Sequence, residues 1–130
     1  MPLPSSAPES WRKVLLVIED RALSDVLAEA LVDAGHVAMQ VEDTASAHDA
    51  FEDQSFDAAI VDLDTRARDG VRLIARLRLE QPATTVIALL PCGGLPSGMA
   101  PPQYHLAIEK PARLSAVLSA VNVAHAAARN

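Results

Sequence analysis

The stretch 56-FDAAIVDLDTRARDG-70 contains a short apolar segment that finishes in two carboxylates, Asp62 and Asp64, and it decides how the chain is expected to fold. Its apolar part, Ala58 to Val61, has the length and β-branched content of a strand buried on both faces. The segment ends at Asp62, and Asp64 follows two residues later. Because a strand interior does not easily keep unpaired anions, both acids are expected where the strand leaves the core.

The same kind of segment recurs along the chain. Strands are predicted at residues 14–18, 36–41, 58–62, 85–90 and 105–109. The first strand is followed by an amphipathic helix that Gly35 ends, with apolar residues at three- and four-residue spacing: Leu23, Val26, Leu27, Ala30, Leu31 and Ala34.

Three further helices are predicted. One runs from Ala45 to about Asp53, with Thr44 as its N-cap and with Ala47, Ala50 and Phe51 facing inward. The next follows a loop at 62–69 and covers the sheet with Val71, Ile74, Leu77 and the stem of Arg78. The last is marked by Leu114, Val117, Leu118 and Val121. The segment 91–104 contains four prolines and three glycines, so a loop with at most one helical turn is expected there.

Strands that alternate with helices predict parallel pairing, right-handed crossovers and a doubly wound α/β sheet. In such a sheet the carboxyl ends of the strands lie on one rim, where ligands bind. Glu19, Asp20, Asp62 and Lys110 each follow or end a predicted strand and are therefore expected on that rim. Glu19, Asp20 and Asp62 have the oxygen ligands that Mg²⁺ prefers, and a lysine beside them suits a phosphoryl group.

Size and composition limit the class of protein. A chain of 130 residues suits one domain, expected at 12–128 after a mobile Pro/Ser-rich tail at 1–11. The net charge of −6 and the lack of a Lys/Arg-rich block argue against direct binding of nucleic acid. A single cysteine excludes an internal disulfide. No segment looks like a secretion signal or approaches the roughly 18 apolar residues of a membrane span, so a cytoplasmic location is expected.

The order and spacing of four motifs resemble the receiver domain of bacterial two-component response regulators. These motifs are Glu19-Asp20, Asp62, Asp69-Gly70 and Lys110-Pro111, and the resemblance covers about residues 12–128. It implies a flavodoxin-like fold with a five-stranded parallel sheet of order 2-1-3-4-5. The fourth helix of that fold, between the fourth and fifth strands, is expected to be short or missing here. It also implies a role in phosphorelay signalling without enzymatic activity.

Carried over to this chain, the resemblance assigns roles to single residues. Asp62 is the phosphoacceptor, and it takes the phosphoryl group from a histidine kinase or a histidine phosphotransferase. Mg²⁺ is held by Glu19, Asp20, Asp62 and the main-chain carbonyl of Asp64. Lys110 contacts the phosphoryl oxygens, and the bond from Lys110 to Pro111 is cis.

Three positions of the switch depart from the family pattern. Leu90 stands where receivers have Thr or Ser, whose hydroxyl binds the phosphoryl group. Pro91 follows it and has no N–H to donate. Ala107 replaces the aromatic switch residue. The expected function is therefore that of an atypical, stand-alone response regulator with an impaired switch, which acts on an unknown target protein or as a homodimer.

Two other functions remain open from the sequence. The chain is a phosphorylation-independent interaction module if Asp62 accepts no phosphate. It is a small phosphatase if Asp62 is the nucleophile of a hydrolase and Asp64 its general acid. The basic run 66-RARDGVRLIARLR-78 also has two interpretations, a surface for an acidic partner or a solvated helix face with stems packed on the sheet.

Overall fold

A five-stranded parallel sheet forms the centre of the computed structural model, which describes residues 11–64, 67–95 and 103–124. Its strands are β1 (Lys13–Val17), β2 (Val37–Val41), β3 (Ala58–Asp62), β4 (Thr85–Leu90) and β5 (Leu106–Glu109). They lie in the order β2-β1-β3-β4-β5, and all neighbouring pairs are parallel. The predicted doubly wound α/β fold and its strand order are confirmed.

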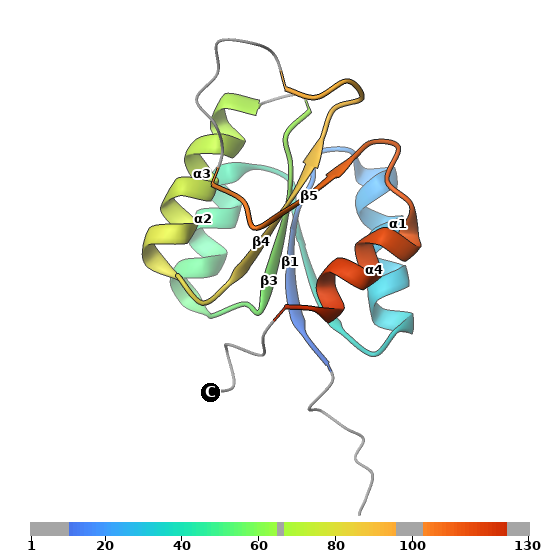
Figure 1. Ribbon diagram of the computed structural model, residues 1–130. Coiled ribbons are helices and arrows are strands. Elements are labelled where there is room, and N and C mark those ends of the chain that lie inside the picture. Colours follow the sequence, from blue (N-terminus) through green and yellow to red (C-terminus); the bar gives the residue numbers. More distant parts are fainter. Residues whose placement is uncertain (1–10, 65–66, 96–102, 125–130) are drawn as a thin grey trace, which may run out of the picture.

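Four helices cover the two faces of this sheet. They are α1 (Arg21–Asp33), α2 (Thr44–Asp53), α3 (Ala67–Glu80) and α4 (Leu114–Asn122). Helices α2 and α3 lie on one side of the sheet, and α1 and α4 lie on the other (Figure 1). Each side has its own core, because successive strand residues point to opposite faces: Leu15 and Val17 pack toward α2 and α3, whereas Val14 and Leu16 pack toward α1 and α4.

Helix α2 begins one residue earlier than predicted. Asp43, not Thr44, is the N-cap: its backbone is extended, and its carboxylate accepts a hydrogen bond from the Ser46 N–H at 2.7 Å. Thr44 is the first helical residue. Both residue types are good caps, and aspartate ranks above threonine.

Helix α3 also begins earlier, at Ala67, so that the loop after β3 is shorter than expected and Asp69 lies in the first turn. Gly70 allows α3 to pack closely against the end of β3. A Cβ atom there would collide with the fully buried Leu63 side chain, so only glycine lets the helix approach the end of β3 this closely. In this orientation Leu73, which the periodicity did not single out, is buried, and Val71 is only half-buried.

Two large apolar side chains that were predicted to face the core lie on the surface. Val26 of α1 is 49% exposed, while Ser24 is buried and its Oγ accepts a hydrogen bond from Gln40 Nε2 at 2.9 Å. Leu114 of α4 is 41% exposed, while Val117 and Val121 are buried. The two errors have different causes. Helix α1 turns the polar Ser24 toward the edge strand β2, whereas α4 buries Val117 and Val121 of its later turns.

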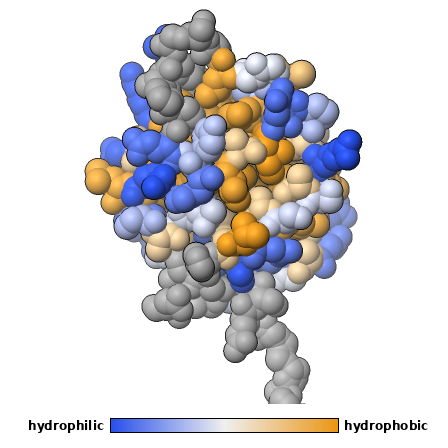
Figure 2. Space-filling model, viewed as in Figure 1, coloured by the Kyte–Doolittle hydropathy of each residue, from blue (hydrophilic) through white to orange (hydrophobic). Residues whose placement is uncertain are grey.

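No helix lies between β4 and β5 in the part of this connection that the structure describes, residues 91–95 and 103–105. Leu95 and Tyr104 are half-buried there and pack against the core on the α3 side. The prediction of a loop at 96–102 falls outside the described residues. Figure 2 shows apolar side chains gathered at the centre of the face formed by β5 and α4. Among the described helices, none is long and apolar enough to cross a membrane.

Stability is expected to fall in mild acid, because His36 is held neutral. Its ring is buried, and Nδ1 accepts a hydrogen bond from the Arg12 N–H at 2.9 Å. Burial lowers the pKa of His36 from 6.5 and the charge of Arg12 lowers it further, against the raising effect of a hydrogen bond with Asn122. The unfolded chain therefore takes up the proton first as the pH falls. The stabilisation is complete above about pH 6.5 and is lost below it, toward the lower pKa of the folded state.

Urea unfolding at a series of pH values measures this loss. His36→Gln removes the titrating ring and keeps a side-chain acceptor, so the decline in the free energy of unfolding below about pH 6.5 should become shallower. Some decline will remain, because burial also lowers the pKa of His105. An equally steep decline in the variant would show that His36 is not the group responsible.

Candidate functional site

The predicted site residues meet at the rim where the strands end. Asp62 is the last residue of β3, Glu19 and Asp20 follow β1, and Lys110 follows β5. The parallel register brings these ends together, since Val17 lies beside Val41 on one side and Val61 on the other. The structure therefore brings Asp62 and Lys110, 48 residues apart in sequence, into direct contact.

Asp62 is the most enclosed acid of this rim, with 9% of its side chain exposed. Its Oδ1 accepts a hydrogen bond from the Asp64 N–H at 3.1 Å, and its Oδ2 accepts one from Lys110 Nζ at 2.9 Å. Each carboxylate oxygen has two lone pairs, so both still have room for a further partner. The carboxylate is thus held in a fixed orientation and remains able to act as a ligand or a nucleophile.

Lys110 joins two carboxylates. Its Nζ lies 2.9 Å from Asp62 Oδ2 and 3.1 Å from Asp64 Oδ2. Burial acts to lower the pKa of Lys110, but the hydrogen bonds and charges of Asp62 and Asp64 outweigh it and raise that pKa above its ordinary value. The amine therefore stays protonated at neutral pH. The peptide bond from Lys110 to Pro111 is cis, as the resemblance implied.

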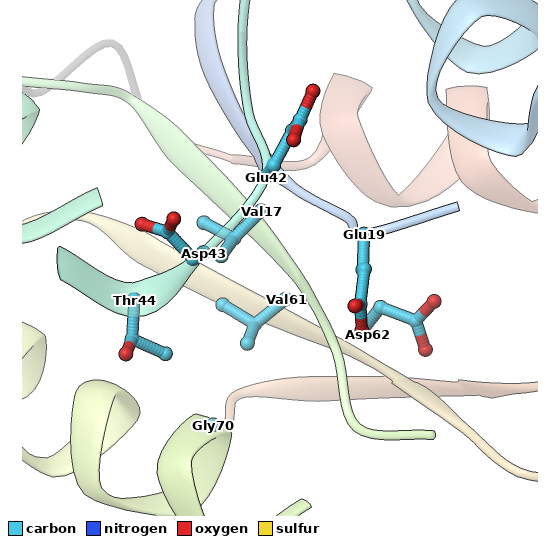
Figure 3. Close-up of a pocket in the computed structure, with 8 residues that line it drawn as sticks. All are labelled: Val17, Glu19, Glu42, Asp43, Thr44, Val61, Asp62 and Gly70. Atoms are coloured by element: carbon cyan, nitrogen blue, oxygen red, sulfur yellow. The ribbon is translucent and has the colours of Figure 1, made fainter. Parts of the chain in front are cut away.

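Glu19 and Asp20 are both exposed. Asp20 caps α1, because its Oδ1 accepts hydrogen bonds from the N–H groups of Ala22 and Leu23 at 3.0 and 3.3 Å. This leaves Oδ2 as the oxygen that Asp20 presents to a ligand. The Glu19 side chain reaches toward Asp62, and both line the same small pocket (Figure 3).

This pocket has a volume of about 40 Å³, and two acids that were not predicted as site residues, Glu42 and Asp43, line it. Its lining consists of Val17, Glu19, Glu42, Asp43, Thr44, Val61, Asp62 and Gly70. Glu42 and Asp43 follow β2, and the rule that picked out the acids after β1 and β3 would have found them. Glu42 points away from Asp62 (Figure 3), and its Oε2 lies 3.5 Å from Arg21 Nη1. The contact between the Asp64 carboxylate and Lys110 was also not predicted, since Asp64 was expected to act through its main-chain carbonyl or, in a phosphatase, as a general acid.

Of the three switch positions that depart from the family pattern, Leu90 and Pro91 lie at the end of β4, where Leu90 contacts Lys110. Leu90 ends β4, and its carbonyl accepts a hydrogen bond from the Lys110 N–H at 2.9 Å. The preceding residue, Leu89, lies in register with Asp62. Pro91 follows and accepts from the Gly94 N–H at 2.8 Å, but it has no N–H of its own. Ala107 is exposed on β5.

A second group of possible metal ligands lies on α2. Ligand atoms of His48, Asp49 and Glu52 come within 4.8 Å of one another. The Arg76 guanidinium, however, lies 2.7 Å from Nε2 of His48. A cation would have to displace that guanidinium, so the rim remains the better candidate for a metal site.

A parallel sheet with this strand order, and with acids and a lysine gathered at its carboxyl rim, defines a receiver-type α/β protein. Residues 14–91, more than half of the 130-residue chain, match the family of the response regulator receiver domain. The chain belongs to this family. It is a response regulator receiver domain of two-component signalling.

Known proteins agree with this assignment. The response regulator protein FleR of Pseudomonas aeruginosa is 30% identical over 83 residues, which are 64% of this chain and 18% of FleR. The chain thus spans less than a fifth of that relative. A putative response regulator from Chloroflexus aurantiacus superposes with a TM-score of 0.73 at 19% identity, covering 85% of this chain and 93% of the other. A structure described as adenylate cyclase from Rhodopirellula baltica gives 0.71 at 20% identity, covering 85% and 84%. At these identities the structural matches show the fold alone.

Proposed function

We propose that this receiver takes a phosphoryl group on Asp62 and passes the signal on weakly, through contacts with partner proteins. The observation that carries the proposal is the position of Asp62. It is a nearly enclosed carboxylate whose Oδ2 is 2.9 Å from a protonated lysine, at the rim where a doubly wound sheet binds ligands.

The phosphoryl group would come from a phosphohistidine of a histidine kinase or a histidine phosphotransferase. An oxygen of the Asp62 carboxylate attacks phosphorus, the P–N bond breaks, and the imidazole leaves with the electron pair and takes up a proton. The product is an acyl phosphate. Lys110 then pairs with a phosphoryl oxygen, and it already makes this kind of charge-assisted hydrogen bond to Asp62 and Asp64.

The chemistry of the rim fits Mg²⁺, which prefers several oxygen ligands and usually keeps part of its water shell. Oxygen ligands would come from Asp62, from Glu19, from Oδ2 of Asp20 and from the main-chain carbonyl of Asp64. When bound, the cation would neutralise negative charge on the phosphoryl oxygens. Within the chain, the acids would hold that cation while Lys110 and the Asp64 N–H fix the orientation of the Asp62 carboxylate.

The switch is proposed to be impaired because three groups that respond to phosphorylation are absent. Leu90 has no hydroxyl and Pro91 no N–H, so two hydrogen-bond donors to the phosphoryl group are lost. Ala107 has no aromatic ring to move. The proposed partners are a histidine kinase or a histidine phosphotransferase, an unknown target protein, or a second copy of the chain. Direct binding of nucleic acid is not expected, and the cytoplasmic location stays a prediction.

Intact-mass spectrometry tests the proposal directly. The chain is incubated with acetyl phosphate and Mg²⁺, and a mass increase of one phosphoryl group is expected. Asp62→Asn should abolish it, and omission of Mg²⁺ should reduce it strongly. Asp53→Asn, at an exposed acid at the end of α2, should leave it unchanged. Labelling that survives Asp62→Asn would overturn the assignment of the phosphoacceptor.

The same experiment separates two of the three candidate functions, and a hydrolysis assay tests the third. A chain that folds but takes up no phosphoryl group from any donor is an interaction module independent of phosphorylation. A chain that hydrolyses p-nitrophenyl phosphate with repeated turnover is a phosphatase. We propose that it is not an enzyme, because the pocket beside Asp62 is too small to enclose a substrate at about 40 Å³.

A further inference from the structure

The outward surface of α3 carries a row of arginines that the proposed function does not use. Arg68, Arg72 and Arg76 are spaced four residues apart and therefore lie on one face of the helix. They span about 12 Å at 1.5 Å per residue. All three are exposed. We call them the arginine stripe.

The positive charge of this stripe is only partly balanced. Arg76 Nε lies 2.8 Å from Glu80 Oε2. Among the described residues, no carboxylate lies within ion-pair distance of Arg68 or Arg72. The helix has four arginines against Asp69 and Glu80, in a chain whose net charge is −6. The stripe is thus a local excess of positive charge on an acidic protein, and two of its three guanidinium groups have no carboxylate partner among the residues that the structure describes.

An apolar residue and a hollow complete this surface. Leu79 continues the same face one turn beyond Ala75 and Arg76, and it is 79% exposed, more than any other large apolar residue whose exposure the structure describes. Beside the stripe, α3 and α2 run together (Figure 1) and enclose a groove of about 270 Å³. Its lining consists of Thr44, His48, Asp69, Arg72, Leu73 and Arg76.

We propose that the arginine stripe, with Leu79 and the groove against α2, docks an acidic amphipathic segment of a partner protein. Guanidinium groups bind carboxylates through two parallel hydrogen bonds, which makes arginine well suited to such pairing. A partner helix with acids at every fourth position would match the stripe residue for residue, and an apolar side chain on it would cover Leu79.

The surroundings favour a protein partner over nucleic acid. Three arginines in a row are a small footprint for a phosphate backbone, and the acids Asp69 and Glu80 flank them on the same helix. The net charge of −6 repels a long polyanion from the whole molecule. An exposed leucine next to the charges has a natural partner in a protein side chain and none in a phosphate backbone.

The probe for this proposal is a synthetic helical peptide of about 16 residues, long enough to span the stripe, with glutamate at every fourth position and one leucine. Amide NMR of the isotope-labelled chain should show saturable shifts confined to α3 and the facing side of α2. Arg68→Gln and Arg72→Gln should each weaken binding about fivefold. Arg113→Gln, the same change at an exposed arginine before α4, should have no effect.

Three results would overturn the proposal. One is equal binding by wild type and Arg72→Gln. Another is equal binding of a matched peptide with glutamine in place of glutamate, which leaves the stripe as a solvated surface. The third is binding of a mixed-sequence DNA duplex to the same amides at lower concentration, which would replace the protein partner by nucleic acid. All the substituted arginines are exposed, so an unchanged amide spectrum elsewhere will show that the variants fold.

Discussion

Restoring two lost donors is expected to lengthen the lifetime of the phosphorylated protein at least tenfold. The double variant Leu90→Thr/Pro91→Ala supplies a hydroxyl and a backbone N–H at the end of β4, next to Asp62 and Lys110. A hydrogen bond to a charged group contributes about 1.5 to 3 kcal/mol, and each 1.4 kcal/mol corresponds to a factor of ten. Both donors would act on a phosphoryl group that carries roughly two negative charges.

Mass spectrometry over time, after removal of the phosphodonor, measures occupancy and half-life. The matched control makes the same two substitutions away from the site, Leu79→Thr/Pro82→Ala, at residues that are both exposed. It should label and decay like the wild type. If the wild type is labelled as fully and persists as long as the Leu90→Thr/Pro91→Ala variant, the missing donors do not limit the acyl phosphate.

Lys110→Met is expected to reduce both phosphoryl labelling and stability. Methionine keeps an unbranched apolar stem but removes the charge that joins Asp62 to Asp64, and the Asp62 side chain is only 9% exposed. Leaving an enclosed acceptor without its donor costs about 1 to 3 kcal/mol, which should appear in urea unfolding without Mg²⁺. Labelling at Asp62 should fall at least tenfold, because the one cation that contacts it in the described structure is gone.

Lys13→Met is the matched control. Lys13 Nζ lies 5.4 Å from the centre of the Phe56 ring, at the opposite end of the sheet, so the same substitution there removes about 0.5 to 1 kcal/mol at most. It should leave labelling unchanged. A Lys110→Met variant as stable and as readily labelled as Lys13→Met would show that Lys110 neither supports the site nor contacts the phosphoryl group.

Much of the fold follows from local patterns. The apolar runs at 14–18, 58–62 and 85–90 predicted the central strands to within one residue, because buried parallel strands need continuous apolar side chains. Helix ends were less certain. Asp43 and Thr44 are adjacent and both can cap a helix, so only the conformation of the loop after β2 decides which of them does.

The candidate site shows the same division. The sequence predicted one shared rim for Glu19, Asp20, Asp62 and Lys110, because the carboxyl ends of parallel strands meet at one edge of the sheet. The position of the Asp64 carboxylate was not. Its contact with Lys110 joins residues 46 positions apart and depends on the course of two loops, which leave no periodic signal in the sequence.

The sequence by itself determined the doubly wound sheet and its acidic rim, because both follow from the order of strands and helices and from the residues that end the strands. It also determined that Leu90 has no hydroxyl and Pro91 no N–H. The tertiary structure alone decided that Lys110 joins Asp62 to Asp64 and that the arginine stripe borders a groove with α2. Such contacts depend on how separate elements pack. A side chain 3 Å from its partner is placed by the register and packing of both elements, which no local pattern encodes.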